Sequence, residues 1–226
     1  MNKRKGRKSG TILCIIVLWS CIFSFRAGAQ NPSSYYIEEP PLFRGGLVAG
    51  ANFGQVDGDK YAGYYKVGIN AGVTLYTRLN NLFSLSMELL YAQKGAKSNF
   101  IKGSSSNIYN IIDQRISLHY AEVPVMLNIT DVHKNYVGAG LAYARLISGT
   151  ETIVTSPNAN YNGDDYPFKK YDVSFVATGN LCLVKGLYAG LRFQYSLLPI
   201  RTKVDYEFAR AKQYNNVWVL RVMYLF

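Results

Sequence analysis

The clearest pattern along the chain is a two-residue alternation of apolar and polar side chains in eight long segments. In residues 82–94, for example, Leu85, Met87 and Leu89 occupy every second position between serines and a glutamate. Successive side chains of a strand point to opposite faces, so this alternation predicts strands with one apolar and one polar face. The predicted strands are Leu42–Gln55, Tyr64–Leu79, Leu82–Lys94, Ile111–Ile129, Tyr136–Ser148, Lys170–Val184, Leu187–Ile200 and Gln213–Phe226.

The lengths of the strands and of their connections indicate a membrane. Each predicted strand has 13 or more residues, whereas globular strands average about 5–6 and a transmembrane strand needs about 9–11. Short turns at one end and long loops at the other are typical of outer-membrane barrels. We therefore predict an all-β fold, an eight-stranded antiparallel up-and-down transmembrane β-barrel over residues 42–226. The short links are Asn80–Asn81, Thr130–Asn135 and Lys185–Gly186; the long ones are Val56–Gly63, Gly95–Asn110, Gly149–Lys169 and Arg201–Lys212.

A soluble β-sandwich is the alternative fold, in which the apolar face would be buried between two sheets. The second face is rich in glycine and poor in charge, which makes it a poor solvated surface. Only 17% of the chain is charged, against about 25% in an average globular protein. After the N-terminus no uncharged apolar stretch reaches the roughly 20 residues of a spanning helix, which excludes a helical membrane bundle.

The N-terminus is predicted to be a signal peptide over residues 1–29. Basic residues at 3–8 precede an apolar region, Thr11–Phe25, and Ala27-Gly28-Ala29 predicts cleavage after Ala29. Residues 30–41 then form a periplasmic lead-in, and an even strand number leaves both mature termini in the periplasm. A lipoprotein box at Leu18–Cys21 is the alternative, disfavoured by the tryptophan beside its cleavage position.

Removal of this leader changes the charge balance. It takes away 6 of the 25 basic residues and none of the 14 acidic ones, so the net charge falls from +11 to +5. We therefore predict no nucleic-acid partner. One cysteine, Cys182, remains, and His119 and His133 lack partners at metal-ligand spacing, so we predict no metal, no cofactor and no catalytic residue. His119 near Ser117 is the one candidate for a lipid-modifying enzyme.

Four charges fall on the polar faces of predicted strands. Glu88 and Glu122 belong to adjacent strands, as do Arg192 and Arg221. An eight-stranded barrel has an interior just filled by side chains, and a buried charge needs a partner. We expect these four residues to form one network in a packed lumen. A gated ion path is the alternative.

The apolar face carries aromatic residues near the strand ends, as expected of the girdles at the two membrane surfaces. The final strand ends in Phe226, and a terminal aromatic resembles the signal that the barrel-assembly machinery reads. Outer-membrane lipid and lipopolysaccharide are the other expected partners.

Two short motifs resemble a known family. Tyr120-Ala121-Glu122-Val123-Pro124-Val125-Met126-Leu127 is similar to the Y-x-E-(I/V)-P-hydrophobic segment of PorT-like outer-membrane barrels. Tyr91-Ala92-Gln93-Lys94-Gly95 resembles the Y-x-x-K-G of the preceding strand, and Gly46–Gln55 resembles the opening segment. The resemblance implies eight antiparallel strands in the outer membrane. The namesake is associated with type IX secretion, a role that these motifs do not assign to this chain.

The predicted function is that of a non-enzymatic integral outer-membrane barrel with a packed lumen, which binds a protein or glycan partner, or supports envelope or secretion assemblies, through extracellular loops. A small-solute, porin-like channel is the alternative, and a lipid-modifying enzyme a third class. Candidate binding residues in the two largest loops are Asn158, Asn160, Tyr161, Asn162, Asp164, Asp165 and Tyr166, and Arg201, Lys203, Asp205, Glu207, Arg210 and Lys212.

Overall fold

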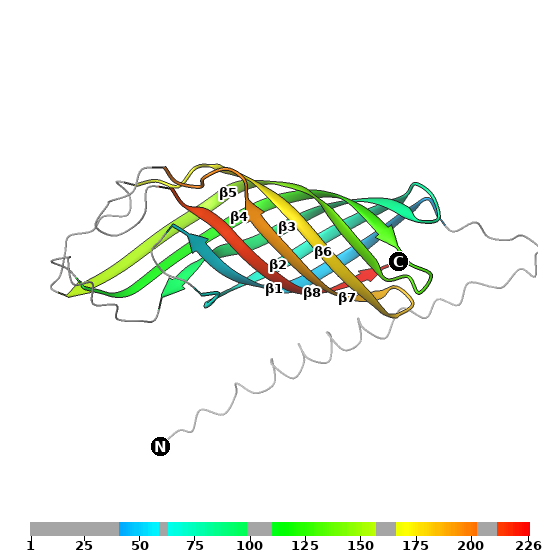
Figure 1. Ribbon diagram of the computed structural model, residues 1–226, viewed down its shortest axis with the longest axis horizontal. Helices are drawn as coiled ribbons and strands as arrows, with labels where there is room; N and C mark the ends of the chain where they lie inside the picture. Colours follow the sequence, from blue (N-terminus) through cyan, green and yellow to red (C-terminus); the bar gives the residue numbers. More distant parts are fainter. Residues whose placement is uncertain (1–40, 59–62, 99–109, 157–165, 203–211) are drawn as a thin grey trace, which may run out of the picture. The chain divides into compact units, whose positions relative to one another are not determined.

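The predicted barrel fold is confirmed. The computed structural model describes residues 41–58, 63–98, 110–156, 166–202 and 212–226. Within them, eight antiparallel strands follow one another around a closed barrel, and β1 pairs with β8 to close it (Figure 1). The strands are β1 (Phe43–Asp57), β2 (Lys66–Arg78), β3 (Phe83–Ser98), β4 (Asn110–Thr130), β5 (Tyr136–Ser156), β6 (Tyr171–Val184), β7 (Leu187–Ser196) and β8 (Tyr214–Leu225).

The two ends of the barrel differ. The end with the short β2–β3, β4–β5 and β6–β7 connections is called the turn end, and the opposite end the loop end. In the β4–β5 turn, the backbone N–H groups of His133 and Asn135 donate hydrogen bonds to Asp131 Oδ1 over 2.7 and 3.1 Å. The start of β1 and the end of β8 also lie at the turn end, where Phe226 N donates to Gly45 O over 3.0 Å.

Strands β4 and β5 are longer than the others, with 21 residues each. The sequence pattern predicted an end at Ser148 for β5, but the strand continues to Ser156. His119 pairs with Ser148 while Tyr120 pairs with Leu146, so the register shifts at Ile147. This bulge interrupts the alternation on which the prediction relied. By contrast β7, predicted to reach Ile200, ends at Ser196.

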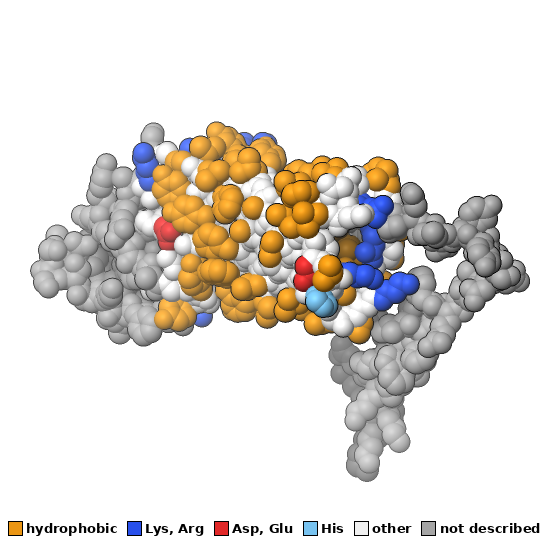
Figure 2. Space-filling model, turned by 45° about the vertical axis from the view of Figure 1, so that its right-hand side comes forward, with side chains coloured by type: hydrophobic (Ala, Val, Ile, Leu, Met, Phe, Trp, Pro, Cys, Tyr) orange, Lys and Arg blue, Asp and Glu red, His pale blue; other side chains and the backbone are white. Residues whose placement is uncertain are grey.

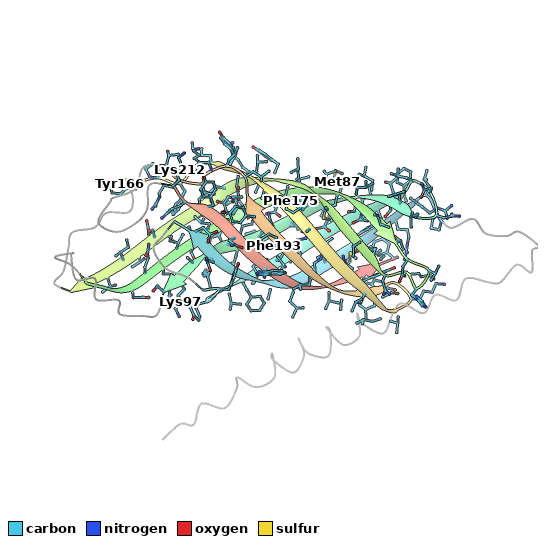
Figure 3. All side chains as sticks on the ribbon, viewed as in Figure 1. Met87, Lys97, Tyr166, Phe175, Phe193 and Lys212 are labelled. Atoms are coloured by element: carbon cyan, nitrogen blue, oxygen red, sulfur yellow. The ribbon has the colours of Figure 1, made fainter. Side chains whose placement is uncertain are left out.

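The faces of the strands follow the alternation. Exposed apolar side chains occur on all eight strands. On the face of the outer wall seen in Figure 2 they form a band, and lysines and arginines lie toward both ends of it. Met87 and Phe175 belong to this wall, while Lys97, Tyr166 and Lys212 lie near the loop end (Figure 3). Polar side chains of the same strands are buried inside. Among the described residues there is no helix with the length and hydropathy of a membrane span.

Candidate functional site: the filled interior of the barrel

A first group of charges lies in the middle of the lumen. Glu88 of β3 accepts hydrogen bonds from two guanidinium groups across the barrel. Arg192 Nη2 lies 2.7 Å from Glu88 Oε2, and Arg221 Nη1 lies 2.9 Å from Glu88 Oε1. Arg221 also donates to Thr178 and Asn180 of β6. All three charged residues are at most 1% exposed, so the ion pairs are shielded from water. We call these residues the Glu88 layer.

A second group lies nearer the loop end. Lys94 Nζ of β3 is 2.6 Å from Glu122 Oε2 of β4 and 3.9 Å from Asp172 Oδ2 of β6. The ammonium group also lies 5.3 Å from the centre of the Tyr120 ring. Asn215 of β8 donates to Asp172 over 3.0 Å, so side chains from four strands meet here. We call these residues the Lys94 layer.

The two layers divide the four residues of the predicted network. Glu88, Arg192 and Arg221 come together, whereas the ion pair of Glu122 is with Lys94. With all groups ionised, the Glu88 layer carries one net positive charge and the Lys94 layer one net negative charge. The two layers together are therefore neutral, which reduces the cost of keeping their six ions away from water.

An aromatic cluster fills the lumen on the turn side of the Glu88 layer. The hydroxyl groups of Tyr76 and Tyr136 hydrogen-bond to each other. The Tyr136 ring packs edge-on against Tyr188, with centroids 5.6 Å apart, and its hydroxyl donates to Met223 Sδ over 3.7 Å. These four side chains come from β2, β5, β7 and β8, so they close the turn end of the lumen from several walls.

The loop end of the lumen is filled by apolar side chains. Val56, Ile116, Leu118, Tyr120 and Ile200 are all fully buried there. Ile200 lies after β7, and its carbonyl accepts a 2.7 Å hydrogen bond from the Lys169 backbone. The chain segments that follow β7 and precede β6 thus fold inward over the mouth of the barrel.

One ion pair fixes this inward-folded segment. Arg201 Nη1 lies 2.5 Å from Glu151 Oε2, and its guanidinium group stacks 3.8 Å from the centre of the Phe168 ring. Glu151 also accepts a hydrogen bond from Gln114 over 3.0 Å. Glu151 belongs to the extension of β5 that the alternation did not predict. The extended wall and the inward segment therefore hold each other in place.

Several interior residues were missed by sequence reasoning. The alternation places Lys94 on the polar face but does not pair it with Glu122. Asp172 was not assigned at all, although Asp172, Ser174 and Thr178 occupy alternate inward positions of β6 and provide the signal that would have found it. The Glu151–Arg201 pair had no such signal, because it joins a strand extension to a loop.

The remaining predicted sites are placed as follows. Ala29 and the signal peptide lie outside the described residues. So do Asn158, Asn160, Tyr161, Asn162, Asp164, Asp165, Lys203, Asp205, Glu207 and Arg210. His119 Nδ1 lies 2.6 Å from the Tyr91 hydroxyl, and Ser117 Oγ accepts a hydrogen bond from Lys66 over 2.8 Å. His119 and Ser117 therefore hydrogen-bond to Tyr91 and Lys66 and not to each other. Within the described part of the chain, no cluster of histidine, cysteine and carboxylate side chains is suited to a metal ion.

A closed barrel with an apolar outer band and a charged, filled interior defines an integral outer-membrane β-barrel protein. The comparisons with known proteins give the family: a model described as outer membrane protein beta-barrel domain matches residues 29–201. The chain belongs to this family, and its location is the outer membrane. No curated protein sequence matches it.

Solved structures of small barrels are similar at low identity. Ail of Yersinia pestis, solved in complex with the heparin analogue sucrose octasulfate, is 12% identical; 82% of this chain and 100% of Ail are covered, with a TM-score of 0.42. AlkL in lipid bilayers is 14% identical; 87% of this chain and 97% of AlkL are covered, with a TM-score of 0.40. OprG from Pseudomonas aeruginosa is 11% identical; 81% of this chain and 94% of OprG are covered, with a TM-score of 0.37. These likenesses assign no activity to this chain.

Phe226 provides a first test of how the barrel is assembled. Its side chain is 72% exposed, and the sequence predicts that it serves as an assembly signal. Deletion of Phe226 should lower the amount of folded barrel in the outer membrane severalfold while leaving export unchanged. Cell fractionation and the gel shift of the folded barrel measure this, with Phe226→Tyr as the control that keeps a terminal aromatic. Equal yields of the deletion and the wild type would contradict the prediction.

Proposed function

We propose that this protein is a non-conducting, non-enzymatic outer-membrane barrel that presents a binding surface at its loop end. The observation that carries the proposal is the filled lumen. Two ion-pair layers lie between an aromatic cluster at the turn end and an apolar cluster at the loop end. A solute crossing this interior would have to break buried ion pairs, each of which costs several kcal/mol to separate.

The loop end is the side on which binding is proposed. Outer-membrane barrels have short periplasmic turns and longer extracellular loops, so we place the turn end and both mature termini in the periplasm. The β4–β5 extension then projects from the outer surface of the cell, and the Arg201–Glu151 pair holds the neighbouring loop stem against it. A rigid projection of this kind suits a protein or glycan partner, because a surface that is already ordered loses little conformational entropy on binding.

The two motifs that resemble those of PorT-like barrels lie next to each other inside the barrel. Lys94 belongs to the Y-x-x-K-G motif, and Tyr120 and Glu122 belong to the Y-x-E-V-P motif. In the structure these three side chains form the centre of the Lys94 layer. We infer that the motifs encode barrel construction. A role in supporting an envelope or secretion assembly is consistent with such a barrel, which supplies a stable membrane-embedded body.

Conductance measurements test the central claim. Purified wild-type protein in planar bilayers should show no stable open state, because side chains fill the lumen. A porin reconstituted in the same way serves as the positive control. Reproducible openings of porin size would overturn the filled-lumen model and favour a channel, whereas turnover of lipid A that is lost on His119→Ala would establish the enzymatic alternative.

A further inference from the structure

Three basic side chains gather on the outer wall at the loop end. Lys97 of β3 and Arg115 of β4 are direct cross-strand partners, which places their β-carbons about 4.5–5.5 Å apart. Both point outward, since Ile116 on the next position of β4 is buried in the lumen. Lys66 of β2 reaches the same place, because its Nζ donates a 2.8 Å hydrogen bond to Ser117 Oγ. Figure 3 shows Lys97 at this end of the barrel.

These cations have no ion-pair partner in the described part of the chain. None of the three residues forms an ion pair among the residues that the structure describes. Asp113 lies two positions from Arg115 on the same face of β4, but it too forms no ion pair there. Lys97 and Arg115 face each other, and the Lys66 ammonium group hydrogen-bonds to Ser117, two positions from Arg115 on the same face of β4, so the three positive charges lie close together. Like charges directly opposite each other destabilise a sheet, so this arrangement favours a bound anion.

The position of the cluster on the wall indicates which anion. The apolar outer row of β3 ends at Tyr91, whose hydroxyl hydrogen-bonds to His119. Tyr91 pairs with Ala121, and Ser117 lies four residues farther toward the loop end. At about 3.3 Å per residue and a strand tilt of about 40°, this is about 10 Å along the barrel axis. The cations therefore lie just beyond the hydrocarbon, at the depth of lipid headgroups.

We propose that Lys66, Lys97 and Arg115 bind a phosphate group of lipid A, the phosphorylated glycolipid of lipopolysaccharide in the outer leaflet. The inference rests on the proposed orientation, with the loop end outside. The Arg115 guanidinium can bind two phosphate oxygens at once, and the two ammonium groups add point charges. Ser117 Oγ accepts from Lys66, so its own hydrogen is available to donate to a phosphate oxygen. The site anchors the barrel to the leaflet that surrounds it.

Lipid binding to matched variants tests the proposal. The Lys97→Gln/Arg115→Gln double variant is compared with wild type and with Lys170→Gln, which removes an exposed lysine next to the loop end of β6. Binding of bisphosphorylated lipid A to each protein in detergent is measured by native mass spectrometry. We expect the apparent Kd to rise about tenfold or more in the double variant, since each basic residue near an anionic surface contributes strongly. Lys170→Gln should stay within about twofold of wild type.

Two further arms identify the bound group. Dephosphorylated lipid A should bind wild type and double variant equally weakly, and millimolar inorganic phosphate should not displace lipid A. The proposal would be overturned if the double variant bound bisphosphorylated lipid A as tightly as wild type does. It would also be overturned if wild type bound dephosphorylated lipid A as tightly as bisphosphorylated lipid A. Displacement by inorganic phosphate would replace the lipid with a free anion as the ligand and would equally overturn it.

The proposal and the orientation on which it rests can fail separately. An epitope inserted within residues 157–165 should be labelled in intact cells, and one inserted between Lys185 and Gly186 only after the outer membrane is permeabilised. The reverse labelling would refute the orientation while leaving binding in detergent unaffected. The double variant should keep the gel shift of a folded barrel and the absence of conductance, because neither substituted side chain enters the lumen.

Discussion

Glu88→Gln should destabilise the barrel by about 3–5 kcal/mol, because it removes the only carboxylate of the Glu88 layer and leaves two guanidinium groups buried. Glutamine has the same shape, so the loss reports charge rather than packing. Arg221→Met should cost less, since Glu88 keeps its 2.7 Å contact with Arg192. Urea unfolding followed by Trp218 fluorescence and by the gel shift measures both variants.

A double-mutant cycle separates this ion pair from its surroundings. Combining Glu88→Gln with Arg221→Met should cost less than the sum of the single effects, because the two residues are in contact. Glu122→Gln with Arg221→Met is the matched control. Glu122 pairs with Lys94, so this second cycle should be additive within about 0.5 kcal/mol. Coupling in the control but not in the Glu88 cycle would contradict the assignment of partners.

Gly95→Ala should have the second large effect, a loss of at least about 3 kcal/mol or failure to form the folded barrel. Gly95 has a φ of 131°, a backbone conformation that residues with a β-carbon rarely adopt. A β-carbon at this position would also lie 2.1 Å from the Ile116 carbonyl oxygen of the paired strand. The same measurements of unfolding and gel shift apply.

Gly179→Ala is the matched control for Gly95. Gly179 is also a strand glycine, but a β-carbon there would meet nothing within 4 Å. Alanine restricts the unfolded chain, so this variant should be neutral or more stable by about 0.4–1 kcal/mol. A similar loss in both variants would mean that the close contact with Ile116 is not what makes glycine necessary at position 95.

The partners of the lumen charges illustrate what the sequence alone leaves open. Alternation along β3 and β4 assigns Glu88, Lys94 and Glu122 to the inner face, and the structure has them there. It does not say at which height each side chain lies relative to strands on the far wall. That height depends on the stagger of all eight strands around the closed barrel. Glu88 therefore meets β7 and β8, whereas Glu122 pairs with Lys94 on the neighbouring strand.

The loop end illustrates a second limit. Residues 149–156 contain β-branched side chains suited to a strand, yet the shift of register at Ile147 breaks the alternation before them. Their pairing with the start of β4 is a contact between distant parts of the chain. The Arg201–Glu151 ion pair depends on that contact in turn, so no local sequence pattern predicts this ion pair.

The sequence by itself determined the number of strands, their inner and outer faces, and the alternation of short turns with long loops. These features follow from the two-residue period of a strand and from local turn chemistry. Both depend only on residues that are close together in the sequence. Tertiary structure alone decided which charges meet inside the barrel, how far β5 projects, and which cations gather on the outer wall. Each of these depends on the register between strands, a property of the closed barrel rather than of any one segment.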